Sequence, residues 1–211
     1  MTPLRPSEAS EHPSGGRGTY TRWAHRVLPR LAIVAISWVL IVPPGMQGQH
    51  SKPKEYEVKA TYLYSFSRFV EWPGQAPQVL TDSFAICVLG ENPFGPVLEA
   101  TVAQETIAGK SVVARHIPTP QDALKCRVLF ISSSEEKQLK QILACLGTAS
   151  VLTVSDLPQF TDRGGMIQFI LEGNRVRFEV NLAPAEHAGL TLSSELLKVA
   201  VNVRKTAQPG D

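Results

Sequence analysis

The residues that could carry out chemistry are few, and they stand apart in the sequence. Beyond residue 50 there are two histidines, His116 and His187, and neither has a cysteine, histidine or carboxylate at the spacing of a zinc site. Three serines, 132–134, could hold a phosphate at a helix N-terminus, although helix capping alone explains them. The glycine-rich phosphate loops and the Gly-x-Ser-x-Gly elbow of hydrolases are absent. The sequence therefore predicts that the protein is not an enzyme and has no catalytic residue, metal site or cofactor.

The three cysteines are the other reactive side chains. Cys87 lies within a predicted strand, 83–89, and Cys126 lies at the start of another, 126–131. Neighbouring strands are about 4.8 Å apart and a disulfide needs Cα atoms roughly 4.4–6.8 Å apart, so adjacent strands could bring the two within bonding distance. An oxidising compartment would favour this bond, and three free thiols are the alternative. Cys145 is left over on a predicted helix as a buried free thiol.

A stretch near the end of the chain, 164–182, has the pattern of two strands joined by a tight turn. Residues 166–171 are apolar apart from one glutamine, which predicts a buried strand, and 172–174 have turn chemistry. The second strand alternates polar and apolar residues, so its polar side chains share one face. These side chains are Arg175, Arg177, Glu179 and Asn181. They form either the wet face of an ordinary hairpin or a row that faces a partner or a ligand.

The beginning of the chain has the features of an export signal. Arginines at 22, 26 and 30 precede the mostly apolar run 31–42. This run is short for a membrane span, which needs roughly 20 residues, and suits the core of a signal peptide. We therefore predict that 1–50 is a signal peptide or N-terminal leader, either cleaved near Gly48 or kept as an anchor.

The charge balance argues against nucleic acid as a partner. The chain has 21 basic and 19 acidic residues, of which five arginines and two glutamates lie in 1–48. The remaining 16 basic and 17 acidic side chains give a net charge of −1. A domain this close to neutral lacks the basic surface that binds a phosphate backbone.

The elements that must position these residues alternate between helices and strands. Helical spacing over 55–72 predicts an aromatic-rich helix with one broad core face. That face holds Val58, Tyr62, Phe66, Phe69 and Val70. Strand-like runs follow at 83–89, 110–117, 126–131 and 151–154, separated by shorter helical patterns. The pattern predicts an α/β fold: a single three-layer domain, 51–205, with a mainly parallel central sheet, an antiparallel C-terminal hairpin and helices on both faces, followed by a disordered tail, 206–211.

Seven short stretches, taken together, resemble the sequence of a known family. They are 56–73 (YEVKATYLYSFSRFVEWP), 84–90 (FAICVLG), 93–95 (PFG), 151–156 (VLTVSD), 164–169 (GGMIQF), 177–181 (RFEVN) and 188–190 (AGL). Taken in this order they resemble the YfiR family of periplasmic regulators. Each stretch is weak alone, but the ordered set covers the whole predicted domain, which is accordingly identified as YfiR-like.

The resemblance implies a function that the residues alone do not show. A YfiR-type regulator lies in the periplasm as a dimer and restrains an inner-membrane diguanylate cyclase by binding its periplasmic part. An outer-membrane lipoprotein sequesters the regulator, and the output is control of cyclic-di-GMP and biofilm formation. The implied partner here is the periplasmic domain of such a cyclase or of a sensor kinase. The alternative is a periplasmic small-molecule binding module, with its ligand at the carboxyl ends of the strands near Gly90 and Ser132.

The resemblance also implies roles for particular residues. Cys87 and Cys126 match a cysteine pair that is bridged in the best-known YfiR protein, and Cys145 leaves no second bridge. The candidate partner-binding surface is the polar row of the hairpin together with an aromatic end, because arginine and aromatic residues are the usual interface anchors. Its residues are Trp72, Arg175, Arg177, Glu179 and Asn181. The other interpretation is that Glu179 and Asn181 only hydrogen-bond to neighbouring loops.

Overall fold

The computed structural model describes residues 52–73 and 83–205, which belong to one unit of the chain, His50–Asp211. The predicted leader, 1–50, and the predicted tail, 206–211, lie outside the described residues. Within the described part of the chain, no helix is both long enough and apolar enough to cross a membrane.

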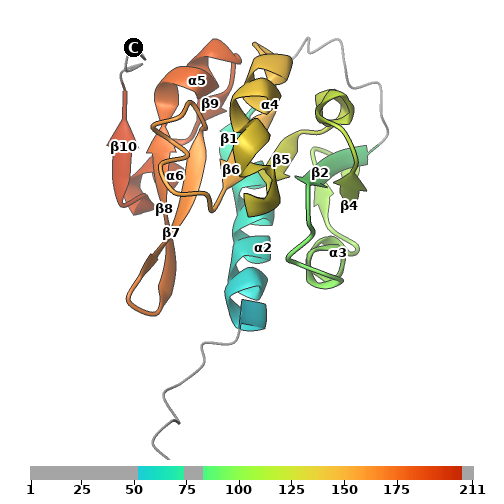
Figure 1. Ribbon diagram of the computed structural model, residues 1–211. Helices are drawn as coiled ribbons and strands as arrows, with labels where there is room; N and C mark the ends of the chain where they lie inside the picture. Colours follow the sequence, from blue (N-terminus) through green and yellow to red (C-terminus); the bar gives the residue numbers. More distant parts are fainter. Residues whose placement is uncertain (1–51, 74–82, 206–211) are drawn as a thin grey trace, which may run out of the picture. The chain divides into compact units, whose positions relative to one another are not determined.

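An eight-stranded sheet forms the centre of the fold, in the order β10-β8-β7-β6-β5-β2-β4-β3 (Figure 1). The strands are β2 (Ser83–Leu89), β3 (Thr106–Ile107), β4 (Lys110–Ile117), β5 (Val128–Ile131), β6 (Leu152–Ser155), β7 (Ile167–Glu172), β8 (Arg175–Asn181) and β10 (Asn202–Arg204). From β4 through β7 the neighbours run parallel, as do β8 and β10, whereas the β7–β8 and β3–β4 pairs are antiparallel. The predicted mainly parallel sheet with an antiparallel hairpin is therefore confirmed.

Helices pack on both faces of this sheet, as predicted. The helices are α2 (Lys52–Phe69), α3 (Val97–Val102), η1 (Pro120–Lys125), η2 (Ser133–Gln138), α4 (Leu139–Leu146), α5 (Leu182–His187) and α6 (Ser194–Val199). One apolar cluster joins α2 and α3 to the sheet and includes Phe130, while a second joins η1 and α4 to it and includes Ile131. Phe130 and Ile131 are consecutive residues of β5, and the period of two sends them to opposite cores.

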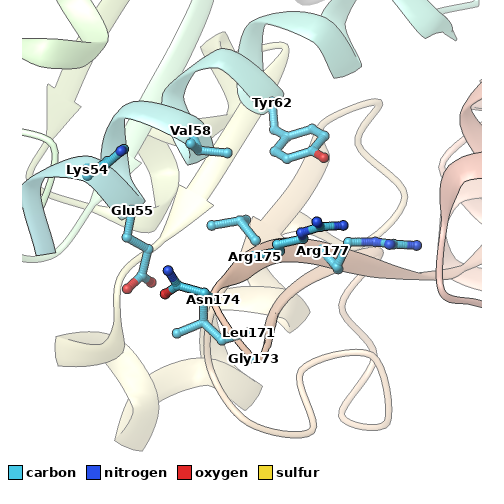
Figure 2. A pocket seen from close by; sticks show the side chains of 10 residues that line it. Lys54, Glu55, Val58, Tyr62, Leu171, Gly173, Asn174, Arg175 and Arg177 are labelled. Atoms are coloured by element: carbon cyan, nitrogen blue, oxygen red, sulfur yellow. The ribbon is translucent and has the colours of Figure 1, made fainter. Parts of the chain in front are cut away.

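Of the core face predicted for the helix at α2, Phe66 and Val70 are buried, Tyr62 is half-buried, and the other two residues are exposed. Ala60, Leu63 and Phe66 are fully buried, at the intervals of three that align residues along a helix. Val58 and Phe69 are 40% and 41% exposed, so the predicted core face is wrong at these two positions. Figure 2 shows Val58 on the side of α2 that faces the β7–β8 hairpin, where it lines a groove instead of the core.

Four short strands are absent from the sequence-based prediction. They are β1 (Val70–Glu71), β3, β9 (Thr191–Leu192) and β10. The predicted helix runs to Trp72, but β1 replaces its last turn and pairs with β9 in a separate two-stranded sheet. Trp72 precedes Pro73, and a residue before proline avoids the helical conformation. Strands of two or three residues are too short to show a period of two.

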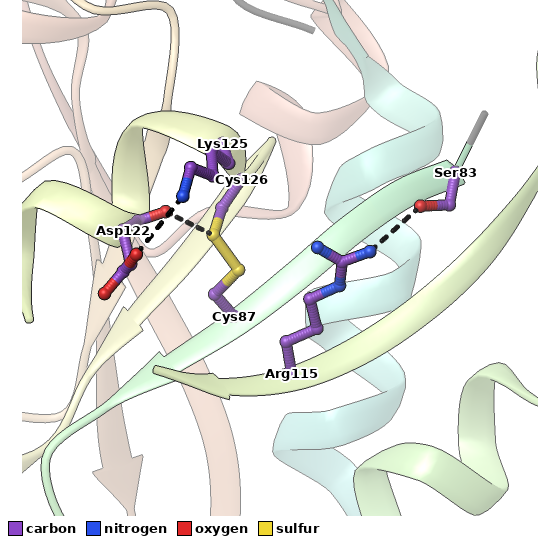
Figure 3. The surroundings of a disulfide bond; sticks show 6 residues. All are labelled: Ser83, Cys87, Arg115, Asp122, Lys125 and Cys126. Atoms are coloured by element: carbon purple, nitrogen blue, oxygen red, sulfur yellow. Dashed lines mark hydrogen bonds and ion pairs between the residues drawn. A yellow bond between two sulfur atoms is a disulfide. The ribbon is translucent and has the colours of Figure 1, made fainter. Parts of the chain in front are cut away.

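A disulfide joins β2 to the residues that lead into β5 (Figure 3). Cys87 and Cys126 are buried in the second core with their Cα atoms 6.0 Å apart. Because β2 and β5 are adjacent parallel strands, the sheet brings the two cysteines within bonding distance, as the sequence predicts. Cys145 on α4 is a free cysteine that is half-buried.

Reduction of the Cys87–Cys126 disulfide should lower the free energy of unfolding by about 4 kcal/mol. The bond closes a loop with a sequence separation of 39, and breaking it restores the entropy of that loop in the unfolded chain. The corresponding fall in melting temperature is roughly 10 °C for a domain of this size. Thermal melts with and without reductant measure it, and Cys145→Ala, which keeps the bridge, should respond equally. Denatured, unreduced protein should contain one titratable thiol, and three would show that the bridge does not form.

Candidate functional site

The polar row of β8 passes from exposed to buried along the strand. Arg175 is exposed, Arg177 and Glu179 are half-buried, and Asn181 is buried. In the antiparallel register, the facing residues on β7 are Glu172, Ile170 and Gln168 for the first three positions. We call the end of the hairpin nearest its turn the outer half. The accessible residues of the polar row lie in this half.

The inner end of the row is built into the fold. Asn181 accepts a hydrogen bond from the Ala183 amide at the start of α5, and its own amide donates to the Thr161 carbonyl at 2.9 Å. Gln168 accepts a hydrogen bond from the Thr161 amide. Asn181 thus caps a helix and holds a neighbouring loop, in agreement with the second interpretation of this residue. The surface that a partner could reach contains Arg175 and Arg177.

A groove lies between the outer half of the hairpin and the first turns of α2, with a volume of about 480 Å³. It is lined by Lys54, Glu55, Val58 and Tyr62 of the helix and by Leu171, Gly173, Asn174, Arg175, Val176 and Arg177 of the hairpin (Figure 2). Val58 is 40% exposed and Leu171 is 57% exposed. This α2–hairpin groove combines exposed apolar side chains with arginines, a composition typical of protein contact surfaces.

Glu55 connects the groove to a buried ion pair. It pairs with Lys59, whose side chain is 3% exposed and whose Nζ lies 2.6 Å from Asp156 Oδ2. The Tyr56 hydroxyl donates to the same Asp156 oxygen at 2.8 Å. The Lys59 ammonium also lies 4.4 Å from the centre of the Tyr56 ring, within the range of a cation–π contact. These contacts fix the first turns of α2 to the end of β6.

The surroundings of Tyr56 keep its hydroxyl protonated. Burial raises the pKa of Tyr56, and the negative charge of Asp156 raises it further. The hydroxyl therefore remains a hydrogen-bond donor to the carboxylate. The cluster of Tyr56, Lys59 and Asp156 is absent from the sequence-based prediction. Two features of the sequence point to it: Lys59 is a charged residue beside the buried row of an amphipathic helix, and Asp156 follows directly after a strand.

Trp72 lies away from the α2–hairpin groove. It follows β1, beyond the last turn of α2, whereas the groove contacts the first turns of that helix. Eighteen helical residues span about 27 Å. The Trp72 ring packs edge-to-face on Phe84, with 5.2 Å between the ring centres. The structure thus does not bring Trp72 together with Arg175 and Arg177.

The carboxyl ends of the strands near Gly90 are filled by groups of the protein itself. A side chain at Gly90 would collide with Ser134 Oγ, which accepts a hydrogen bond from the Glu91 amide. The His116 Nε2 atom lies 2.6 Å from the Gly90 carbonyl oxygen. Ser132 is buried. The position at which the sequence suggests a small-molecule ligand is therefore occupied.

The groove and its surroundings are suited to binding. The charged side chains of Glu55, Lys59 and Asp156 are paired with one another. No group of three or more metal-ligating residues lies together in the described ranges 52–73 and 83–205. What these residues offer to a second molecule is an accessible surface of arginine and apolar side chains. The fold and this surface define a single α/β domain with an accessible groove.

This class agrees with the comparison with known families. The model of the YfiR/HmsC-like family matches residues 56–201, so the chain belongs to that family. The matched residues include both sides of the α2–hairpin groove and the disulfide. Membership supports a role in the regulation of diguanylate cyclase signalling from the periplasm, in a family of regulators rather than enzymes.

Two solved structures resemble part of the fold. A conserved domain protein from Vibrio cholerae O1 biovar El Tor matches with 12% identity and a TM-score of 0.45, over 60% of this chain and 57% of that one. The ABC domain in complex with L-Trp from Streptococcus pneumoniae matches with 10% identity and a TM-score of 0.43, over the same shares. The chain thus spans less than two thirds of either protein, and likenesses of this size carry no argument about function.

Removing one member of the buried ion pair should lower the free energy of unfolding of the protein. We expect Asp156→Ala to lower the free energy of unfolding by about 3 kcal/mol, because Lys59 keeps only the more exposed carboxylate of Glu55 and the Tyr56 hydroxyl loses its acceptor. The control is Glu136→Ala, which breaks the surface pair between Arg163 and Glu136 and should cost less than about 1 kcal/mol. Chemical denaturation measures both values. Equal effects of the two substitutions would show that Lys59 is not held by Asp156.

Proposed function

We propose that this protein is a periplasmic repressor of a membrane-bound diguanylate cyclase, and that it binds the periplasmic domain of the cyclase through the α2–hairpin groove. The observation that carries the proposal is the outer half of the hairpin, which projects past the rest of the sheet beside the first turns of α2 (Figure 1). Together with family membership, this projecting surface supports action by protein contact.

The side chains at the groove indicate what kind of surface the partner would present. Burial of the exposed 40% of Val58 and 57% of Leu171 by a partner would contribute about 0.6–1.7 kcal/mol for each side chain. Arg175 and Arg177 favour carboxylates, which they can bind with two parallel hydrogen bonds. The partner segment should therefore be apolar along one face and acidic at its edge. A sensor kinase with such a periplasmic segment would fit the same groove.

Other parts of the proposal follow from the family. Residues 1–50 direct the protein to the periplasm, the regulator acts as a homodimer, and an outer-membrane lipoprotein competes with the cyclase for it. In this arrangement, loss of the regulator leaves the cyclase active. Cyclic-di-GMP and biofilm formation then increase.

Charge reversal in the groove should abolish repression without unfolding the protein. We expect deletion of the gene in its native host to raise cyclic-di-GMP, and the wild-type gene to restore the original level. The variant Arg175→Glu/Arg177→Glu should fail to restore it, because the reversed charges repel an acidic partner. Its melting temperature should change by no more than about 3 °C, since Arg175 is exposed, Arg177 is half-buried, and substitutions at such positions away from special contacts cost little.

The matched control is Lys137→Glu/Lys140→Glu, an equal charge reversal on exposed residues of η2 and α4. This control should repress like the wild type. Both variants are also tested for co-purification with a cyclase from detergent-solubilised host membranes. A large fall in the melting temperature of the groove variant would show that the arginines are structural. Unchanged cyclic-di-GMP after deletion, with no cyclase captured, would overturn the proposal.

A further inference from the structure

A second pocket lies at the opposite end of α2, where the amino ends of three parallel strands meet. Ser83 begins β2, Lys110 begins β4, and Arg127 directly precedes β5. The volume of this pocket is about 480 Å³, within the range of small-molecule sites. The proposed contact with a cyclase makes no use of it.

Two buried hydrogen-bond donors in this pocket have no partner among residues 52–73 and 83–205. They are the indole nitrogen Nε1 of Trp72 and the guanidinium nitrogen Nη1 of Arg127. Buried polar groups are nearly always hydrogen-bonded in folded proteins, so two unpaired donors lining one pocket call for an explanation. Burial lowers the pKa of Arg127, as expected for a cation that has lost water without gaining a counter-ion. Neither nitrogen is accessible as the side chains stand, so an acceptor in the pocket would satisfy both donors once the Trp72 and Arg127 side chains turn toward it.

The remaining lining residues indicate the charge and the shape of such a ligand. The cationic side chains of Arg68 and Arg127 outnumber the carboxylate of Glu71. Apolar surface comes from Val70, Phe84 and Ile107. The pocket therefore favours a molecule with an anionic head and an apolar body.

We propose that this pocket binds a small organic carboxylate. Its oxygen atoms accept hydrogen bonds from the Arg127 guanidinium and the Trp72 indole, and its body lies against Phe84 and Ile107. A carboxylate fits better than an inorganic anion because its planar oxygens match the guanidinium and because the apolar lining gains a partner. The proposal goes beyond the repressor function, since it requires no second protein.

The indole proton of Trp72 provides a direct test in the full chain. The sequence has three tryptophans, and Trp72→Phe identifies the Trp72 signal in a ¹H–¹⁵N NMR spectrum. The probe is benzoate, with benzamide as its uncharged analogue and inorganic phosphate as an anion without an apolar body. We expect benzoate to shift the Trp72 signal in a saturable manner. Benzamide and phosphate should bind at least about tenfold more weakly, because each lacks one of the two interactions.

Substitution of Arg127 tests the other donor. Arg127→Met should weaken benzoate binding at least about tenfold. The matched control Arg163→Met removes an exposed arginine that pairs with Glu136, and should bind benzoate like the wild type. Arg127→Met should melt no lower than the wild type, because the guanidinium has no buried partner to lose. If it fails to fold, Arg127→Lys, which keeps the charge but not the planar fork, should still bind benzoate more weakly.

Several results would overturn the carboxylate site. They are the absence of a saturable benzoate shift at millimolar concentrations, equal binding of benzamide, and unchanged binding by the folded Arg127 variant. The groove variant Arg175→Glu/Arg177→Glu should bind benzoate normally. Failure of this site and failure of the cyclase contact are therefore distinguishable.

Discussion

The packing of α2 against the hairpin is the constraint on which the rest of the structure depends. Phe66 is fully buried, and its ring centre lies 5.8 Å from that of Phe169 on β7 and 5.0 Å from that of Phe178 on β8. Full burial of a phenylalanine side chain contributes about 1.5–3 kcal/mol, and each favourable ring pair adds about 0.5–1.5 kcal/mol. Because these rings join an early helix to late strands, both sides of the α2–hairpin groove are fixed together.

The Lys59–Asp156 pair acts on the same helix in a different way. Desolvation of two charges offsets most of their attraction, so a buried ion pair contributes little net stability relative to apolar side chains. It does penalise any placement of α2 in which Lys59 remains buried without Asp156, since Glu55 on the same helix is then its one acidic partner. The aromatic rings thus provide the stability of the helix–hairpin contact, while Lys59, Tyr56 and Asp156 select one position of the helix along the sheet.

The sequence predicts those features that are set by local patterns. Alternation along β8, apolar runs in β2 and β5, and glycine at the hairpin turn are each visible within a few residues, so the α/β fold and the hairpin follow from them. The Cys87–Cys126 bridge follows once the two strands are adjacent. The Lys59–Asp156 contact joins residues 97 positions apart, and no local pattern specifies which buried charge will meet which carboxylate. The prediction for α2 is wrong at Val58 for the same reason, because this residue could face either the core or the groove until the hairpin is placed.

Each end of α2 has a feature that lowers the stability of the fold, and the free-energy costs of the two features differ. An exposed leucine such as Leu171 costs little, since much of any protein surface is apolar, and its meaning comes from the arginines and Val58 beside it. An unpaired buried donor costs about 1–3 kcal/mol, and the pocket at Trp72 and Arg127 has two of them. A stable fold tolerates two unpaired donors most readily where a ligand satisfies them, so the pocket at Trp72 and Arg127 gives stronger physical evidence of binding than the exposed groove does.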